Sequence, residues 1–475
     1  MEFLLQRRDP YFIPLFLAGL LTGFIFYYLP FLTALSLVAV VVLVLLTWKW
    51  LEVGIYFCLL FVPVELHSLE FLPGFMRYVD ELILVIMAGI ILYRIVVKGE
   101  KFHPTPLGIP LLVFVGVGLL SMVFNRVNPI VGIAGLRAML QYVILYYVII
   151  HAHLDKKKYR RLITLFLIVA AITVFYGYFQ QAIGLEASAD WEMRRYHQDI
   201  DLRVYSTMEN PNTYGAYLVV MMGLTLNLFF TFFNYDRLKS FYLGGLALLL
   251  FWGLLMTYSR MSLLSLLVAL VALALIRFRK YVPLLVLAGV GVLLILPPEF
   301  YSRLTFVLSP EYIELSLKGG RLYLMQKSWE VVSLSPFLGV GPGMFGGSVA
   351  GIFDSPIYQL MDMPYHMNLD NFYFQVWTEM GTLGLLAFLW LFLSIIKQAL
   401  RAYRQVTDPY WQGVAAGALT VFAGITFQSL VAGIWEVHQV ASYLWFLAAL
   451  TYLMTNPWKE TSRIDRQTRK RGSSP

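Results

Sequence analysis

Long apolar runs separated by short polar segments make up most of this chain. A membrane-spanning helix needs about 20 predominantly apolar residues. Candidate runs begin near residues 11, 30, 50, 80, 106, 129, 161, 212, 241, 261, 281, 371, 412 and 436. The first three are crowded around Pro30, where two runs can merge or lie flat in the membrane. The pattern therefore predicts an all-α polytopic integral membrane protein with about 12–14 transmembrane helices.

The polar breaks divide the chain into five predicted parts. They are N-terminal transmembrane helices at 1–183, central transmembrane helices with a short outer loop at 184–297, a large extracytoplasmic loop at 298–370, C-terminal transmembrane helices at 371–455 and a disordered basic cytoplasmic tail at 456–475. The large loop far exceeds about 15 residues, so we expect it to have structure and function of its own. Leucine, methionine, tryptophan and valine recur at helical spacing within it, which predicts a helix over residues 321–332.

Charge supports a membrane protein and sets its expected orientation. Only 13% of the 475 residues are charged and 59% are hydrophobic, whereas soluble domains have about 25% charged residues. The formal net charge is +8, but most Lys and Arg lie in short runs between apolar segments, which argues against nucleic-acid binding. These runs fall after alternate spans, and we therefore expect both termini in the cytoplasm. A single cysteine, Cys58, excludes an intrachain disulfide and a cysteine-based zinc site.

An arginine at a predicted hairpin tip is the first candidate for binding a substrate. Arg260 lies in the segment Thr-Tyr-Ser-Arg-Met-Ser-Leu-Leu at 257–264, between two apolar runs on the predicted outer side. A charge at membrane depth is costly and is a functional candidate for that reason. An interfacial arginine that reaches toward lipid headgroups is the equally weighted alternative. A guanidinium at this place can bind a diphosphate through two parallel hydrogen bonds.

A second arginine precedes a glycine-rich stretch in the large loop. Arg321 follows two glycines, Trp329 comes eight residues later, and residues 336–346 read Pro-Phe-Leu-Gly-Val-Gly-Pro-Gly-Met-Phe-Gly. Three of these glycines match a dinucleotide-binding fingerprint, but a helix precedes them and no βαβ unit surrounds them. A turn that allows close backbone approach is the better interpretation. Aromatic residues such as Trp329, Phe345 and Tyr358 are candidates for stacking on sugars or for an interfacial belt.

Titratable residues come next, at the predicted outer mouth of the following span. His366, Asp370 and Glu379 can each take a proton from an attacking sugar hydroxyl. Helix capping by Asp370 and Asn371 is the favoured interpretation of this block taken alone. A fourth block, residues 203–215, contains Asn-Pro-Asn, which is a helix-start signal. Its Arg203 is either another phosphate ligand or an ion-pair partner within the loop.

In content and order these four blocks resemble the O-antigen ligase/polymerase family of membrane glycan transferases. That family has an arginine loop with Pro-Asn, then Ser-Arg-x-x-x-Leu, then an arginine with a downstream tryptophan and Pro-x-x-Gly-x-Gly-x-Gly. A His-Asn pair with a glycine eleven residues after the histidine completes the pattern. The resemblance extends over about residues 200–385 and departs at one position, where Asp370 replaces the ligase histidine. This departure favours a polymerase over a strict lipid-core ligase.

The resemblance implies a GT-C-like fold and transfer of glycan from an undecaprenyl-diphosphate-linked oligosaccharide at the outer face of the bacterial inner membrane. Arg260 and Arg321 would bind the diphosphate, with Arg203 as a third ligand, and Asp370, His366 and Glu379 would be the catalytic candidates. No metal and no cofactor are expected. The expected partners are lipid-linked oligosaccharide, a glycan, lipid or protein acceptor and membrane lipid. The alternative is a lipid-linked oligosaccharide flippase or another multi-span transporter, but we find no internal repeat and the charges cluster at one face.

Overall fold

The computed structural model describes residues 29–64, 74–185, 202–208, 210–283, 309–363 and 367–456, together with isolated positions 287, 290, 291 and 306. Within these residues the secondary structure is helical and contains no strand. The chain is an all-α polytopic membrane protein, and the fold class predicted from the sequence is confirmed.

The first half of the described chain contains the helices that precede the hairpin tip. They are α2 (Phe31–Lys49), α3 (Leu51–Phe61), α4 (Val79–Val96), α5 (Gly108–Phe124), α6 (Pro129–Leu140), α7 (Val143–His151), α8 (Lys156–Ile183), α9 (Pro211–Phe232) and α10 (Arg237–Met256). Short 3-10 turns η2 (Val62–Val64) and η4 (Gly74–Tyr78) lie on either side of the gap before α4. Several helices begin at side-chain caps, as at α9, where Asn210 accepts from the Asn212 N–H and Pro211 occupies the first turn.

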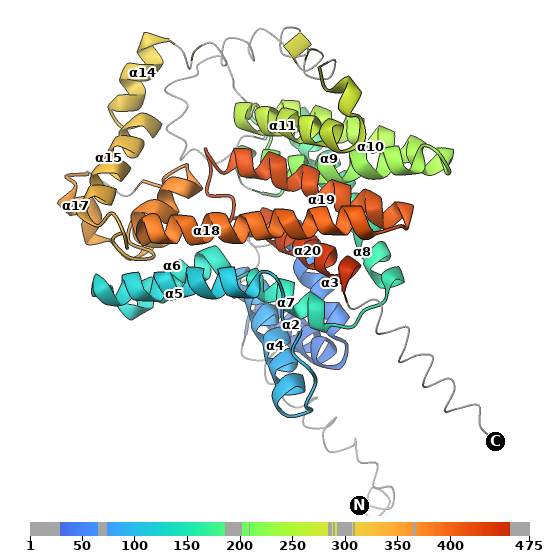
Figure 1. Ribbon diagram of the computed structural model, residues 1–475, viewed down its shortest axis with the longest axis horizontal. Coiled ribbons are helices and arrows are strands. Elements are labelled where there is room, and N and C mark those ends of the chain that lie inside the picture. Colours follow the sequence, from blue (N-terminus) through green and yellow to red (C-terminus); the bar gives the residue numbers. More distant parts are fainter. Residues whose placement is uncertain are drawn as a thin grey trace, which may run out of the picture.

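The second half of the chain contains the remaining helices. They are α11 (Arg260–Arg277), η6 (Arg279–Tyr281), α14 (Pro310–Leu317), α15 (Arg321–Leu334), α16 (Ser348–Ile352), α17 (Pro356–Leu360), α18 (Phe372–Gln405), α19 (Pro409–Gln428) and α20 (His438–Thr455). The helix predicted over residues 321–332 is α15, and the predicted hairpin tip at 259–260 lies where α10 passes into α11. In Figure 1, α14, α15 and α17 gather at one end of the helical body, and α18 runs through its middle.

The described residues contain six helices long and apolar enough to cross a membrane, or seven if the bent pair α6 and α7 forms one span. This is fewer than the 12–14 spans predicted from the sequence. Helices α3 and α5 fall in a shorter apolar class of 10–17 residues. The predicted run near residue 11 lies outside the described residues, and most of the run near 281 does as well. The predicted starts within the described ranges each have a helix beginning within about five residues.

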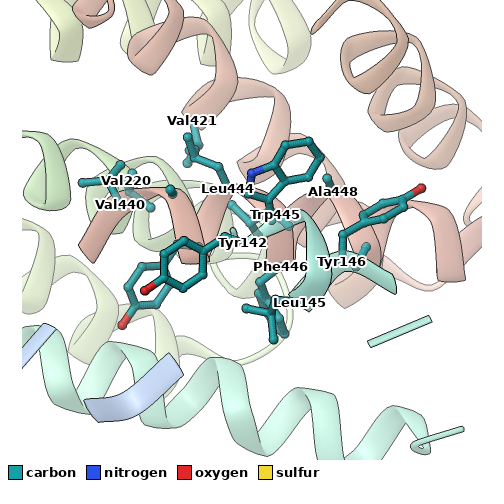
Figure 2. Packing of buried hydrophobic residues seen from close by; sticks show 14 of the residues in the cluster. Tyr142, Leu145, Tyr146, Val220, Val421, Val440, Leu444, Trp445, Phe446 and Ala448 are labelled. Carbon is teal, nitrogen blue, oxygen red and sulfur yellow. The ribbon is translucent and has the colours of Figure 1, made fainter. Parts of the chain in front are cut away.

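Helix α9 lies at the centre of the bundle, and α10 lies at its periphery. The most apolar window of α9 is 78% buried, whereas the corresponding window of α10 is 28% buried. Helices α9, α19 and α20 pack side by side in the core, with α7 against α20. Figure 2 shows Tyr142, Tyr146, Trp445 and Phe446 within this core, where aromatic rings meet edge to face.

A smaller hydrophobic core lies beneath the segment between α14 and α18. Its buried members are Leu324, Val331, Val340, Phe345, Ala350, Tyr358, Met363 and Leu369. Because α15, the glycine stretch and α17 all contribute to it, this segment is a folded unit rather than an irregular loop. We call it the cap segment, residues 309–370, and the end of the bundle that it covers the site end.

Candidate functional site

The hairpin between α10 and α11 is tightly packed at the site end. Ser259 and Ser262 share a hydrogen bond of 2.9 Å, and Gln428 of α19 donates to the same Ser262 hydroxyl at 2.9 Å. A Cβ at Gly215 would lie 2.3 Å from the Ser262 hydroxyl oxygen, so α9 approaches this hairpin closely. These contacts fix the position from which Arg260, the first residue of α11, projects.

Arg203 connects the segment before α9 to the hairpin. Its Nε donates to the Thr257 carbonyl at 3.0 Å and its Nη2 donates to the Asn212 side chain at 3.1 Å. The neighbouring Val204 N–H donates to the Met256 carbonyl at 3.1 Å. Arg203 therefore connects the start of α9 to the turn that precedes Arg260. Its predicted role as a third diphosphate ligand stays a prediction.

Arg260 of the hairpin and Arg321 of the cap segment are close enough to interact electrostatically. Arg260 is partly buried and interacts electrostatically with Arg321 at the start of α15 and with the Tyr312 hydroxyl of α14. Like charges held close together repel, and this repulsion is relieved when an anion lies between them. The arrangement therefore provides two guanidinium groups at the junction between the bundle and the cap segment.

Arg321 is bound to Asp370 across the cap segment. Its Nε and Nη2 donate to the Asp370 Oδ2 at 3.2 and 3.1 Å, and the two side chains are 34% and 48% exposed. Asp370 is not the helix cap: the side chain of Asn371 caps α18 by accepting from the Phe374 N–H at 3.1 Å. The capping interpretation thus applies to Asn371 only, and the Asp370 carboxylate stands beside an arginine at an accessible position.

The glycine stretch docks into a break in α18. Gly381 has φ 66° within that helix, and the freed N–H groups of Thr382 and Leu383 donate to the Pro336 and Phe337 carbonyls. A Cβ at Gly381 would lie 2.3 Å from the Phe337 carbonyl carbon, which only glycine avoids. The glycine that ends the sequence motif, eleven residues after position 370, is therefore required by the backbone conformation at this break. These glycines do not form a nucleotide-binding turn.

Glu379 lies behind the glycine stretch and not at an open surface. It is 1% exposed, and its carboxylate accepts from the Gly343 N–H at 2.9 Å and the Phe345 N–H at 3.4 Å. The glycine stretch is in turn bonded to the residue before Asp370, because the Gly346 carbonyl accepts from the Leu369 N–H at 2.7 Å. Glu379 thus connects α18 through the glycine stretch to Asp370, and the geometry favours positioning over direct proton transfer.

Two further residues beside this stretch were not identified from the sequence. The side chain of Gln375, one turn into α18, donates to the Glu436 carboxylate, which lies in the turn before α20. A Cβ at Gly347 would lie 3.2 Å from the same carboxylate. Burial raises the pKa of Glu436 to about 7. Neither residue belongs to a recognisable motif, and only the packing of α20 against α18 brings Glu436 to the site end.

The aromatic candidates separate into buried and exposed residues. Phe345 and Tyr358 stack on each other in the core of the cap segment, so sugar stacking by these two side chains is excluded. The Tyr358 hydroxyl accepts from the Gly346 N–H and donates to the Met367 carbonyl, both at 3.0 Å, and burial raises its pKa to about 12. Trp329 is 61% exposed and meets Trp377 edge to face at 5.2 Å. It remains available to a sugar.

His366 lies outside the described residues, so its predicted role stays a prediction. Across the described ranges, no group of three or more His, Cys, Asp or Glu side chains is placed to hold a metal ion. The expectation of metal-independent chemistry without a cofactor likewise stays a prediction.

A comparison with protein-family models matches residues 245–389 to the family described as O-antigen ligase. The match includes the hairpin with Arg260, the cap segment and the first half of α18, and Arg203 lies outside it. The family predicted from the four sequence blocks is confirmed by this match. No curated protein matches the chain.

Proposed function

From the O-antigen ligase domain that the chain carries at residues 245–389, we propose that it transfers glycan from an undecaprenyl-diphosphate-linked oligosaccharide. The family supports a glycan-transfer role of the ligase and polymerase type in general. The lipid carrier, the outer-face location of the site in a bacterial inner membrane and the residue roles below belong to the proposal. Polymerisation is the favoured reaction, because Asp370 replaces the histidine of the ligases.

The observation that supports this function best is the contact between Arg321 and Asp370 near Arg260. A donor diphosphate carries more negative charge than one carboxylate and competes with Asp370 for the Arg321 guanidinium. Binding would place the diphosphate against Arg260 and Arg321 and release the Asp370 carboxylate toward the acceptor. The same event therefore supplies the anion-binding group and the base.

The reaction follows from these positions. An acceptor hydroxyl attacks the anomeric carbon of the donor sugar, and its proton passes to the Asp370 carboxylate. The bond between that carbon and the diphosphate oxygen breaks, and the lipid diphosphate leaves with the electron pair. Arg260 and Arg321 stabilise the negative charge that develops on the leaving group. Arg203 and Glu379 would act through position, by holding the hairpin and the glycine stretch.

The decisive experiment uses purified protein in liposomes with a labelled undecaprenyl-diphosphate oligosaccharide and no added acceptor. Wild type should produce longer lipid-linked chains, and Arg321→Ala should not. Lys318→Ala is the matched control, since Lys318 is an exposed cation of the same segment that pairs with Glu314. Without product from wild type, the polymerase assignment fails, and lipid, glycan and protein acceptors are then added one class at a time.

A transporter is the competing function and predicts a different result in the same liposomes. Transport of the labelled oligosaccharide across the bilayer without a change in its length, and dependent on Arg260, would replace glycan transfer with translocation. The location of Arg260 and Arg321 at the end of the bundle, rather than midway along spanning helices, argues against it.

A further inference from the structure

A cavity of about 950 Å³ lies at the end of the bundle opposite the site end. Helices α8 and α10 meet toward the site end, where the Tyr178 hydroxyl donates to the Leu249 carbonyl at 2.6 Å and Val174 adjoins Gly253. Toward their first residues the same two helices line the cavity instead, together with the last turns of α9 and the start of α19. The cavity is therefore a groove between helix ends that closes toward the bundle interior.

The walls of the groove are apolar and the mouth is charged. The apolar side chains that line it come from α8, α9 and α10 and are Ile163, Leu167, Leu228, Phe232 and Leu243. Helix α10 is the peripheral helix described above, so this groove opens toward the surroundings of the bundle. An apolar groove at the end of spanning helices suits hydrocarbon chains.

Two cations and two carboxylates lie at the mouth, and each cation pairs with one carboxylate. Arg160 lies 3.8 Å from the Asp408 carboxylate and stacks over the Tyr410 ring at 4.2 Å. Lys239 lies 2.7 Å from the Asp236 carboxylate. All four line the cavity, and their formal charges cancel.

We propose that this groove binds a zwitterionic phospholipid of the phosphatidylethanolamine type. The lipid phosphate would lie between Arg160 and Lys239, and its ammonium group would donate to Asp236 and Asp408. The acyl chains would follow the apolar walls. A lipid with a net negative headgroup would face the same two carboxylates without a cation of its own, and is disfavoured for that reason.

This site is separate from the proposed donor site. Helix α10 has Lys239 in its first turn, whereas its last turn leads into the hairpin that precedes Arg260. Helix α18 likewise begins beside Asp370 and ends just before Asp408. The lipid proposal therefore does not depend on the glycan-transfer proposal and is tested without any donor.

Native mass spectrometry of the purified wild-type protein tests the proposal, with phosphatidylethanolamine, phosphatidylcholine and phosphatidylglycerol added separately. We expect one phosphatidylethanolamine to be retained most strongly, followed by phosphatidylcholine, whose quaternary ammonium cannot donate hydrogen bonds. Equal retention of all three lipids, or preference for phosphatidylglycerol, would overturn the proposal. Because this comparison needs only wild type, it does not depend on whether a variant folds.

The double variant Arg160→Gln with Lys239→Gln tests the location. Loss of the charge-assisted hydrogen bonds should weaken phosphatidylethanolamine retention about tenfold. The matched control is Lys157→Gln with Arg404→Gln, two exposed cations at the same end that do not line the groove. Retention by the groove variant equal to that of the control would remove the lipid from this site.

Discussion

Two guanidinium nitrogens of Arg321 converge on one carboxylate oxygen of Asp370, at 3.2 and 3.1 Å. Both side chains are partly exposed, so water screens the pair and its contribution to stability is small. The contact matters for the proposed function, because it holds a proposed base and a proposed diphosphate ligand at the same place. A substrate that binds one of them changes the surroundings of the other.

Two substitutions of Arg321 distinguish the effect of its positive charge from the effect of its planar pair of donors. Arg321→Lys keeps the positive charge but loses the planar pair of donors, so we expect turnover to fall about tenfold or more. Arg321→Ala should lose about 100-fold, as expected for removal of a donor that stabilises a leaving group. Initial rates of chain growth in liposomes measure both effects. Equal rates for Arg321→Lys and wild type would show that geometry at this position does not matter.

Asp370 variants test the base. Asp370→Asn should reduce turnover about 10²–10⁴-fold, since an amide cannot accept the hydroxyl proton. Asp370→His restores an acceptor that titrates near pH 6.5, so activity should return in part and fall as the pH drops below about 6.5. The pH profile of initial rates distinguishes this result from a structural rescue. Full activity of Asp370→Asn would remove Asp370 from the mechanism and direct attention to His366.

Arg203 is expected to act through the hairpin. Arg203→Ala removes charge-assisted hydrogen bonds to Thr257 and Asn212, which should cost about 1.5–3 kcal/mol of folding free energy. The midpoint of thermal unfolding in detergent should fall, and turnover should fall with it. A variant that lost donor affinity at an unchanged unfolding midpoint would instead make Arg203 a diphosphate ligand.

Two glycine substitutions test the break in α18: one at the break itself and a control in α10. Gly381→Ala introduces a Cβ that would lie 2.3 Å from the Phe337 carbonyl carbon at a positive φ, and we expect a loss of about 3 kcal/mol or more. Gly245→Ala in α10 meets nothing within 4 Å and should be neutral or slightly stabilising. Thermal unfolding of both variants provides the comparison. Similar midpoints for the two would contradict the docking of the glycine stretch.

The raised pKa of Glu436 predicts that the free energy of unfolding depends on pH. Its pKa is raised by burial from 4.5 to about 7, so the folded protein keeps a proton that the unfolded chain loses between these values. This contribution is fully present below about pH 4.5 and is lost as the pH rises through about 7, by up to about 3 kcal/mol. Glu436→Gln keeps the acceptor for Gln375 and should unfold at a midpoint that changes less between pH 5 and 8. An identical pH dependence in both proteins would exclude Glu436 as the titrating group.

Much of the fold could be predicted because membrane helices are encoded locally. Apolar runs located the helices, Asn-Pro marked the start of α9, and the period of Leu322 and Trp329 located α15. The number of spans was not predictable in the same way. Residues 129–151 form one apolar run, but a break near Gln141 bends it by 56° into α6 and α7, and hydropathy does not register a bend.

Candidate site residues could be identified from the sequence where a residue type is unusual for its place. Arg260 stood out because a cation between apolar segments is costly, and Arg321 stood out because it precedes a glycine-rich stretch; the two interact electrostatically. Glu379 also stood out, but its burial against two backbone N–H groups depends on how the glycine stretch folds back on α18. Glu436 lies 57 residues after Glu379 in the chain, and no local pattern connects them.

The insertion of the glycine stretch into α18 has a consequence for biosynthesis. Residues 336 and 337 are synthesised well before residues 382 and 383, which supply the N–H groups that their carbonyls accept. The glycine stretch can therefore complete its hydrogen bonds to α18 only after that helix has been synthesised. A nascent chain released before this point holds both arginines but no assembled centre. Under the proposed function, glycan transfer would therefore begin only once α18 is in place.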